Sequence, residues 1–216
     1  MGIPLLALRT QDHEVKVFHN VCSHRGNKLV WDACNAKKAM TCPYHAWSYA
    51  LDGRLLTTPH IGGHGHHQVE GFDKSKHGLR EVRSHVWMDV VFVTLEENQP
   101  PFPEYIAGLE KRFHDLSNAD QYAALVPAKD NGVLHLKFDA NWKLVIENNL
   151  ESYHLPWVHP DVNAISRLED HYHFYGGEVF AGQGSTAYAP DRGNLEEFPR
   201  LEPWNAHYAE YPTLFP

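Results

Sequence analysis

The chain has 216 residues, of which 43% are hydrophobic and 21% are charged, a composition typical of one large globular domain or two small ones. It contains no run that approaches the roughly 18 consecutive apolar residues of a membrane span, and its first residues lack the pattern of a signal peptide. The formal net charge is −8 and the basic residues are not clustered, which argues against binding to nucleic acid.

The first hundred residues have the pattern of short strands separated by turns. The turn signal Asp52-Gly53 lies within the third strand-like segment and predicts a hairpin there. The last segment contains two strands, and residues 86–95 have the strongest strand pattern. The strand-like segments are PLLALRT (4–10), VKVFHN (15–20), WSYALDGRLLT (47–57) and GLREVRSHVWMDVVFVTLE (78–96).

The second half mixes helices and strands. The proline-rich segment ENQPPFPEY (97–105) indicates a domain boundary. Helices are predicted for residues 104–116, which are amphipathic, and for residues 141–155, with Asn141 as the cap. Strands are predicted for VLHLKFDAN (133–141) and, one or two with loops, for residues 168–191. Because the first strand has nothing before it and the last segment supplies few elements, we expect both ends to be truncated.

Two Cys/His pairs form the first candidate site. Cys22-x-His24 is followed by 17 residues and then by Cys42-x2-His45, each pair on a tight loop between predicted strands. Two cysteines with two histidines suit a tetrahedral zinc ion or a Rieske [2Fe–2S] cluster. A zinc finger places its histidines together on a helix, whereas here each loop supplies one Cys and one His, which fits the cluster. The remaining Cys34 is interpreted as a packed or surface thiol, and so few cysteines favour a reducing, cytoplasmic compartment.

The loop sequences CSHRG and CPYHAWSYALDGRL resemble the two cluster loops of a Rieske protein. Rieske proteins of the respiratory-complex type carry two further cysteines that tie the loops by a disulfide. Asn27 and Tyr44 stand at those positions here. The chain therefore resembles the oxygenase and ferredoxin branch, whose clusters pass electrons at low potential.

The segment ENNLESYHLPWVHP (147–160) contains the second candidate site. His154 and His159 are five residues apart, so on a regular helix their side chains would point roughly 140° apart. Pro156 disfavours helical geometry at Leu155 and has no N–H to donate, which predicts a helix break that lets both histidines reach one metal. Two histidines and a carboxylate suit Fe(II) with open positions for O₂. The alternative is an exposed helix end with unrelated histidines.

This segment, preceded by Asn141-Trp142-Lys143, resembles the mononuclear iron site of Rieske non-haem iron oxygenase large (alpha) subunits, the aromatic-ring-hydroxylating dioxygenase family. The resemblance extends over essentially the whole chain. It implies an α+β fold: an all-β Rieske domain over residues 1–98, with antiparallel sheets, two cluster-binding loops and its N-terminal part missing. Residues 99–216 would form part of a helix-grip-like α+β catalytic domain.

The resemblance also implies roles for individual residues. Cys22, His24, Cys42 and His45 would hold the [2Fe–2S] cluster, and His154 and His159 would bind the mononuclear iron. Glu151 lies on the same helix face as His154 and could bind the metal or hydrogen-bond a ligand imidazole. In the family the acid at this position bridges to a cluster histidine of the neighbouring subunit, equivalent to His45.

Three further details follow from the resemblance. Glutamate at position 151, where aspartate is commoner, leans toward the branch that acts on quaternary amines. Asn148 matches a family position near the iron. The third iron ligand is expected to be an aspartate beyond Pro216, so the activity of the chain by itself is uncertain.

The implied activity is that of the oxygenase component of a multicomponent Rieske mono- or dioxygenase. It would use O₂ and electrons from NAD(P)H, delivered by a reductase directly or through a ferredoxin, to hydroxylate or oxidatively demethylate an aromatic compound or a quaternary amine. The family forms rings, usually homotrimers, with electron transfer between subunits, and no nucleic-acid or membrane partner is expected. Two other hypotheses remain: a Rieske electron-transfer protein with a non-catalytic appended domain, and a zinc-binding structural protein.

Overall fold

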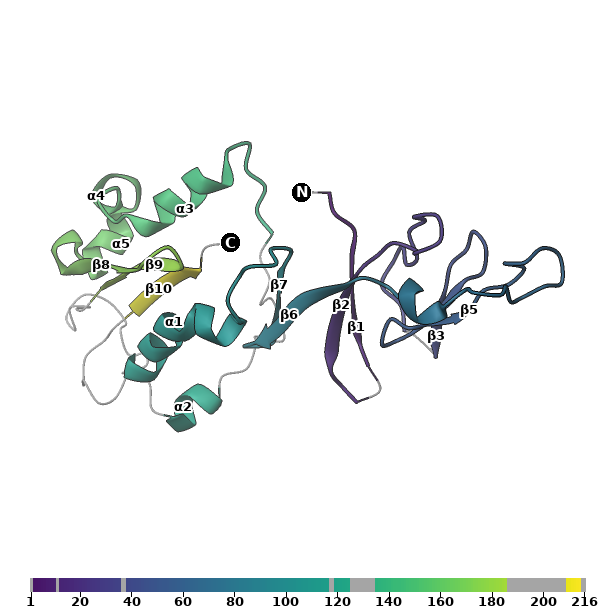
Figure 1. The fold of residues 1–216 in the computed structure, drawn as a ribbon. Coiled ribbons are helices and arrows are strands. Elements are labelled where there is room, and N and C mark those ends of the chain that lie inside the picture. The colour runs from purple at the N-terminus through teal and green to yellow at the C-terminus, as the bar shows by residue number, and fades with distance from the viewer. Residues whose placement is uncertain are drawn as a thin grey trace. The chain divides into compact units, whose positions relative to one another are not determined.

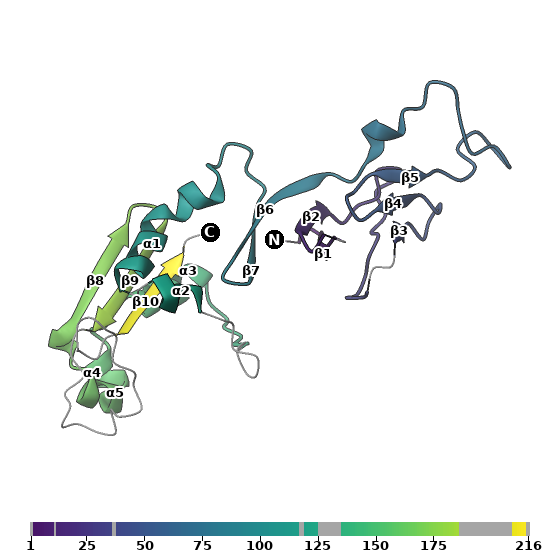
Figure 2. The same ribbon diagram turned by 90° about the horizontal axis from the view of Figure 1, so that it is seen from below.

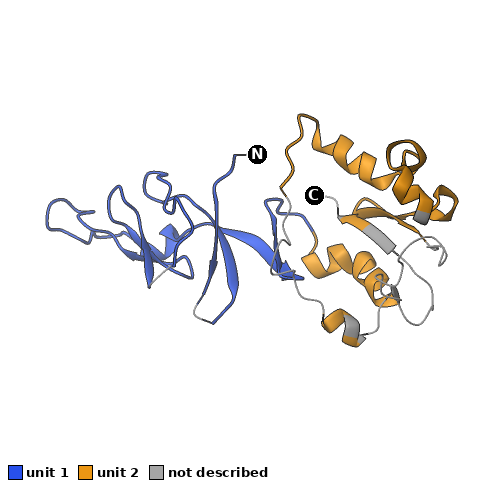
Figure 3. Ribbon diagram, turned by 180° about the vertical axis from the view of Figure 1, so that it is seen from behind, with its two compact units in different colours: residues 1–99 blue, residues 100–216 orange. Residues whose placement is uncertain are grey.

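The computed structural model describes residues 2–10, 12–35, 38–116, 119–124, 135–185 and 209–214. The chain divides into two compact units, residues 1–99 and 100–216 (Figure 3). The strand pairs of both units are antiparallel, and all α-helices of the described residues lie in the second unit. The predicted α+β fold class is therefore confirmed, whereas the division into Rieske and catalytic domains at residue 98 stays a prediction.

The first unit contains a four-stranded sheet in the order β1-β2-β6-β7 (Figure 1). Its strands are β1 (Leu5–Arg9), β2 (Val15–His19), β6 (Glu81–Trp87) and β7 (Val90–Thr94). The hairpin turn falls at Met88 and Asp89, whose φ values are +48° and +59°, as a two-residue type I′ turn requires. The prediction of one strong strand over residues 86–95 was therefore wrong, because neither turn residue is the usual Gly or Asn that signals this turn.

A second sheet carries the predicted hairpin. Its strands are β3 (Ala39–Thr41), β4 (Ser48–Ala50) and β5 (Leu55–Thr57), and the short 3-10 helix η1 (Lys74–His77) follows. The turn at Asp52–Gly53 is confirmed. Gly53 has φ +86°, and a Cβ there would lie 2.5 Å from the Phe18 ring, so only glycine fits.

The hydrophobic core of the first unit includes both predicted cluster cysteines. Its buried members are Phe18, Cys22, Leu29, Met40, Cys42, Trp47, Tyr49, Leu55 and Leu79. The core therefore packs directly beneath the two candidate cluster loops, and the apolar burial that stabilises the sheets also fixes the positions of the two thiols.

The second unit is a three-stranded sheet, in the order β10-β9-β8, with helices on both faces (Figures 1 and 2). On one face, α1 places Gly108 against the Phe180 ring and Arg112 over the Phe174 ring at 3.7 Å. On the other, the Gln183 amide donates to the Asn149 carbonyl of α3 at 2.8 Å. The elements are α1 (Phe102–Leu116), α2 (Ala119–Ala123), α3 (Trp142–Leu150), α4 (Leu155–Val158), α5 (Pro160–Ile165), η2 (Leu168–Asp170), β8 (His171–Gly176), β9 (Phe180–Ser185) and β10 (Ala209–Leu214).

Two predictions for this unit are confirmed. The predicted helix over residues 104–116 is α1, which begins at Phe102 because the Pro101 carbonyl accepts hydrogen bonds from the Glu104 and Tyr105 N–H groups. The strands predicted within residues 168–191 are β8 and β9, and residues 186–191 lie outside the described part of the chain.

Two other predictions were wrong. Residues 135–140 form no strand, because no described strand pairs with them, and residues 133–134 lie outside the described residues. The helix predicted over residues 141–155 ends at Leu150.

No helix among the described residues has both the length and the apolar character needed to cross a membrane.

Candidate metal centres

The first cluster loop is a tight turn that begins at a buried cysteine. The Cys22 N–H donates to the Asn27 carbonyl at 2.8 Å, and the Gly26 N–H donates back to the Cys22 carbonyl at 2.9 Å. Gly26 has φ +70°, a left-handed conformation that glycine adopts without strain. The loop thus reverses the chain within a few residues and leaves His24 at its outer end.

The second cluster loop repeats this pattern. The Cys42 N–H donates to the Trp47 carbonyl at 2.8 Å, the Ala46 N–H donates to the Cys42 carbonyl at 3.0 Å, and Ala46 has φ +57°. In both loops the residue four after the cysteine is left-handed. The two loops therefore have the same backbone geometry, although only the first has a glycine that could have signalled it.

A buried asparagine, which sequence reasoning missed, holds the first loop in place. The Asn20 carboxamide oxygen accepts the N–H groups of Leu29 and Val30 at 3.0 Å each, and its amide donates to the Val30 carbonyl at 2.7 Å. Asn20 is 3% exposed, so these bonds satisfy polar groups that water cannot reach. They tie the chain before the loop to the chain after it.

The two loops bring the four predicted cluster residues together, with sulfur inside and imidazole outside. Cys22 and Cys42 are 3% and 2% exposed and form no disulfide. The His24 and His45 rings meet edge to face, 4.7 Å apart between centroids, with His24 exposed and His45 half-buried. The His24 ring also stacks on the Trp47 indole at 4.6 Å.

Tyr49 connects the core to the first thiol. Its buried hydroxyl is 3.1 Å from the Cys22 Sγ and 3.0 Å from the Ser23 Oγ, and it accepts the Ser23 N–H at 3.1 Å. The Ser23 hydroxyl in turn donates to the His77 carbonyl at 2.6 Å. Burial, followed by the hydrogen bond with Cys22, raises the pKa of Tyr49 to about 12. The phenol therefore keeps its proton at neutral pH and can donate it to sulfur.

The electrostatics around His24 favour a neutral ring. Desolvation, followed by the nearby His45 and Arg25, lowers the pKa of His24. A histidine must be neutral to bind a metal, so the direction of this shift suits a ligand.

These residues fit a [2Fe–2S] cluster. Within the described part of the chain, no three His, Cys, Asp or Glu side chains converge closely enough to hold one metal ion. A Rieske cluster does not need such convergence, because each of its irons takes only two protein ligands: two thiolates on one and two imidazoles on the other. The buried pair of thiols beneath the outer pair of imidazoles matches that division.

The second candidate site lies where α3 ends. Glu151 caps the C-terminus of α3 with extended φ and ψ angles, and α4 starts at Leu155. Pro156 therefore occupies the first turn of a new helix, where its missing N–H costs nothing. The helix break predicted at Pro156, between His154 and His159, is therefore wrong, because residues 155–158 form α4. The chain leaves the helix earlier, at Glu151, before His154.

A carboxylate–histidine pair marks this break. The Glu151 carboxylate accepts the His154 backbone N–H at 3.2 Å through Oε2, and Oε1 hydrogen-bonds the His154 Nδ1. Because Nδ1 then carries the proton, the Nε2 lone pair of His154 is left for a metal. Glu151 thus contacts the predicted ligand His154, as the second of its two predicted roles requires.

The short helix α4 brings the two histidines together despite their spacing. The His154 and His159 ring centroids are 5.4 Å apart, and His159 sits at the junction between α4 and α5. Asn148 is exposed on α3. Among the described residues, no further acidic, cysteine or histidine side chain completes a group of three that could hold one metal ion.

A buried hydroxyl network fixes the segment that follows. At the end of α5, the Ser166 hydroxyl donates to the Ser185 hydroxyl of β9 at 2.8 Å and lies 2.9 Å from the His171 Nε2. Ser166 and Ser185 are 3% and 1% exposed. The helical segment that carries His159 is therefore anchored to the sheet at its far end.

Comparison with known proteins identifies both units. Residues 1–72 match the family described as the Rieske [2Fe-2S] domain, and residues 126–216 match the ring hydroxylating alpha subunit (catalytic domain). The chain belongs to the Rieske oxygenase large-subunit family. Membership confirms the predicted cofactors, a [2Fe–2S] cluster and a non-haem iron, while the assignment of individual ligands in this Rieske oxygenase sequence stays a prediction.

Curated relatives of this Rieske oxygenase chain act on small organic substrates. The glycine betaine monooxygenase oxygenase subunit of Pseudomonas aeruginosa is 36% identical over 159 residues, which are 74% of this chain and 34% of that protein. The carnitine monooxygenase oxygenase subunit of Escherichia coli K12 is 29% identical over 184 residues, 82% of this chain and 45% of that protein. The chain thus spans less than half the length of these relatives.

Solved Rieske oxygenase structures share the fold. The match with a solved quaternary ammonium Rieske monooxygenase covers 86% of this chain and 48% of that protein's chain, with a TM-score of 0.69 and 26% identity. The match with naphthalene 1,2-dioxygenase from Rhodococcus sp. covers 98% of this chain and 52% of that protein's chain, with a TM-score of 0.71. At 20% identity the second likeness shows the fold alone.

Proposed function

We propose that this chain is the oxygenase component of a Rieske non-haem iron monooxygenase that demethylates a quaternary ammonium compound. The observation that carries the proposal is the hydrogen-bonded pair of Glu151 and His154 beside His159, in a chain that also contains the two Cys/His loops. Glutamate at position 151 and the similarity to glycine betaine and carnitine monooxygenases support the substrate class.

Each cofactor has its own set of proposed ligands. When bound, the cluster stores one electron and the Fe(II) ion allows O₂ to react beside the substrate. Cys22 and Cys42 hold one iron of the cluster, and His24 and His45 hold the other. His154 and His159 would hold the mononuclear iron, His154 through the Nε2 that its hydrogen bond to Glu151 leaves free.

Glu151 has two tasks in this proposal. Its carboxylate keeps a proton on the His154 Nδ1, which orients the ring and leaves Nε2 free. It also links His154 to His45 of a neighbouring copy, so that an electron crosses from one subunit to the next in a homotrimeric ring. A solved quaternary ammonium Rieske monooxygenase, 27% identical to this chain, is described in terms of inter-subunit electron transfer.

The reaction needs an external electron source. An N–CH₃ group, O₂, two electrons and two protons give an N–CH₂OH group and water, and the N–CH₂OH group then releases formaldehyde and a proton to leave the tertiary amine. NAD(P)H supplies both electrons through a reductase, directly or by way of a ferredoxin.

Iron content tests the two proposed sites. We expect about three irons per reconstituted chain, two in the cluster and one mononuclear. His159→Ala should remove the mononuclear iron and leave the Rieske absorption and electron paramagnetic resonance signal unchanged. Loss of both centres together would show that the site is misplaced. About two irons in the unmodified chain would favour the electron-transfer protein instead.

Product analysis tests the substrate class. The full chain, with NADH and a reductase, should release formaldehyde from glycine betaine or carnitine in proportion to the O₂ consumed. Anthranilate serves as the aromatic comparison, because a 36% identical relative is an anthranilate 1,2-dioxygenase large subunit. Hydroxylation of anthranilate without formaldehyde release from either amine would overturn the quaternary ammonium assignment.

A further inference from the structure

A series of stacked rings leads away from the candidate cluster inside the first unit. The Trp47 indole is nearly parallel to the His24 imidazole, at 10° and 4.6 Å between centroids. The Trp47 ring is also T-shaped to the Phe72 and His77 rings, with centroid distances of 5.8 Å and 6.3 Å. Phe72 and His77 are themselves stacked, 4.6 Å apart and at 13°. Four rings are thus in near contact from a predicted cluster ligand to η1.

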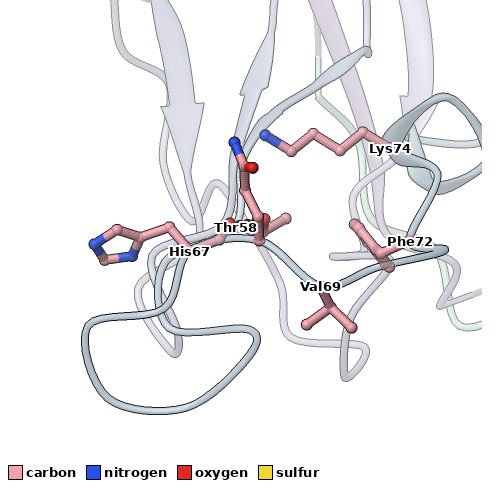
Figure 4. Close-up of a pocket in the computed structure, with 6 residues that line it drawn as sticks. Thr58, His67, Val69, Phe72 and Lys74 are labelled. Carbon is pink, nitrogen blue, oxygen red and sulfur yellow. Dashed lines mark hydrogen bonds between the residues drawn. The ribbon is translucent and has the colours of Figure 1, made fainter.

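The series ends at a surface pocket. The pocket has a volume of about 250 Å³ and is lined by Thr58, His67, Gln68, Val69, Phe72 and Lys74. Figure 4 shows the Lys74 side chain extending along one side of this pocket, near Phe72, while the His67 ring points away. The Lys74 ammonium group donates to the Leu56 carbonyl at 3.1 Å, which holds a positive charge at the rim.

Basic side chains outnumber acidic ones around this end of the series, although the whole chain has a net charge of −8. The segments 22–31 and 70–80 meet where the Ser23 hydroxyl donates to the His77 carbonyl. Their charged side chains are Arg25, Lys28, Lys74, Lys76 and Arg80 against Glu70 and Asp73, and Arg80 is paired with Glu97 at 3.7 Å. The Lys76 side chain is 78% exposed, and its ion pair with Asp73 is loose at 3.8 Å. Such a local excess of positive charge attracts an acidic partner and speeds its encounter.

The proposed function requires a second face for electron delivery, because His45 faces Glu151 of the neighbouring subunit. We propose that electrons arrive through the rings of Phe72, His77 and Trp47, and that the surface around the pocket beside Phe72 and Lys74 docks an acidic iron–sulfur protein. One electron leaves the reduced centre of that partner and reaches the oxidised cluster through His24, with no bond made or broken. The rate of electron tunnelling falls exponentially with distance and falls more steeply through empty space than through packed atoms. Rings in contact therefore transfer the electron faster than the same distance without them would.

Charge reversal tests the docking face. The probe is an acidic plant-type [2Fe–2S] ferredoxin, chemically reduced and mixed with the reconstituted, oxidised full chain in a stopped-flow instrument. Lys74→Glu with Lys76→Glu should slow the second-order reduction about tenfold or more at low ionic strength. The difference should shrink at about 1 M salt, where the Debye length is about 3 Å. Arg9→Glu, at the opposite end of β1 from the cluster loops, is the control, and Lys74→Glu alone, which changes the net charge by the same amount as Arg9→Glu, should still be reduced more slowly than it.

A ring deletion tests the path itself. Phe72→Leu keeps an apolar side chain against Trp47 but removes the aromatic link. It should lower the limiting first-order rate at saturating ferredoxin severalfold, at any ionic strength. Val69→Ala changes the wall of the same pocket without touching the ring series and should leave that limiting rate as in the unmodified chain. Dithionite, a small reductant that needs no docking face, should reduce Phe72→Leu and Val69→Ala at the rate of the unmodified chain.

The outcomes separate this inference from the proposed function on which it rests. If the lysine variant is reduced as fast as Arg9→Glu, or if Phe72→Leu keeps the full limiting rate, the path is wrong while the oxygenase assignment stands. A chain that assembles no Rieske cluster, or whose cluster dithionite does not reduce, contradicts the proposed function before the path is tested.

Discussion

The two candidate metal centres are built in different ways. In the first unit, both cysteines belong to the core, and the loops are tied by Asn20 and by Tyr49. In the second unit, His159 is exposed and the neighbouring Trp157 side chain is 84% exposed. The first centre is therefore held by packing against the core, whereas one carboxylate, Glu151, orients the second.

The difference follows from the secondary structure that carries each site. The cluster loops connect strands whose side chains are buried together, so their position is fixed by the same apolar area that stabilises the sheets. Helix α3, which leads into the second site, has no buried residue, and a nine-residue helix with so little burial is only marginally stable. Metal binding should thus stabilise the second site more than it stabilises the first.

The largest expected effect is at a core cysteine. Cys42→Ser should abolish the Rieske absorption completely, because a serine hydroxyl does not replace a thiolate ligand, while the mononuclear iron remains. Visible spectroscopy and iron analysis of the reconstituted chain measure both results. Cys34→Ser, at an exposed cysteine, is the control and should change neither. An unchanged cluster spectrum in Cys42→Ser would refute the first assignment.

The next effect concerns Asn20, whose hydrogen bonds hold the first cluster loop in place. Asn20→Ala leaves the buried N–H groups near Leu29 and Val30 without an acceptor, so the free energy of unfolding of the metal-free chain should fall by about 3 kcal/mol. Urea denaturation followed by circular dichroism measures this. The exposed Asn35→Ala should stay within about 0.5 kcal/mol of the unmodified chain. Equal losses in the two variants would mean that Asn20 does not hold the loop.

A smaller effect is expected where one carboxylate orients the second site. Glu151→Gln should weaken mononuclear iron binding about 10- to 100-fold, because a neutral amide no longer fixes the proton on the His154 Nδ1. Iron titration monitored by metal analysis after dialysis gives the affinity. Glu147→Gln, one turn earlier and exposed, removes the same charge and should bind iron normally. If both variants bind equally well, Glu151 has no orienting role.

The smallest effect is a change of potential at the first site. Tyr49→Phe removes the hydroxyl beside the Cys22 sulfur, so the reduced cluster loses a hydrogen bond and its reduction potential should fall by roughly 50 mV. Because the pKa of Tyr49 is raised to about 12, the bond and the shift should persist across neutral pH. Protein-film voltammetry measures the potential. Tyr44→Phe, an exposed tyrosine beside His45, should shift it far less.

Several features of this protein could be predicted from the sequence because they depend on local chemistry. The spacing of the two Cys/His pairs predicted a binuclear cluster, and Asp52-Gly53 predicted the hairpin that follows the second pair. The amphipathic period predicted α1. The alternation of residues 135–140 misled, because an alternating segment becomes a strand only where a neighbouring strand pairs with it.

Other features were decided by tertiary structure alone. The hydroxyl of Tyr49 meets Cys22 across 27 positions in the sequence, and Trp47 stacks on His24 because the two loops face each other over one core. The His154 and His159 rings lie close together as expected, but not through a break at Pro156: the short helix α4 separates them, and the chain turns again at His159. The sequence by itself determined which candidate ligands are present. Packing decided which of them are held rigidly, because contacts between distant segments leave no local pattern to read.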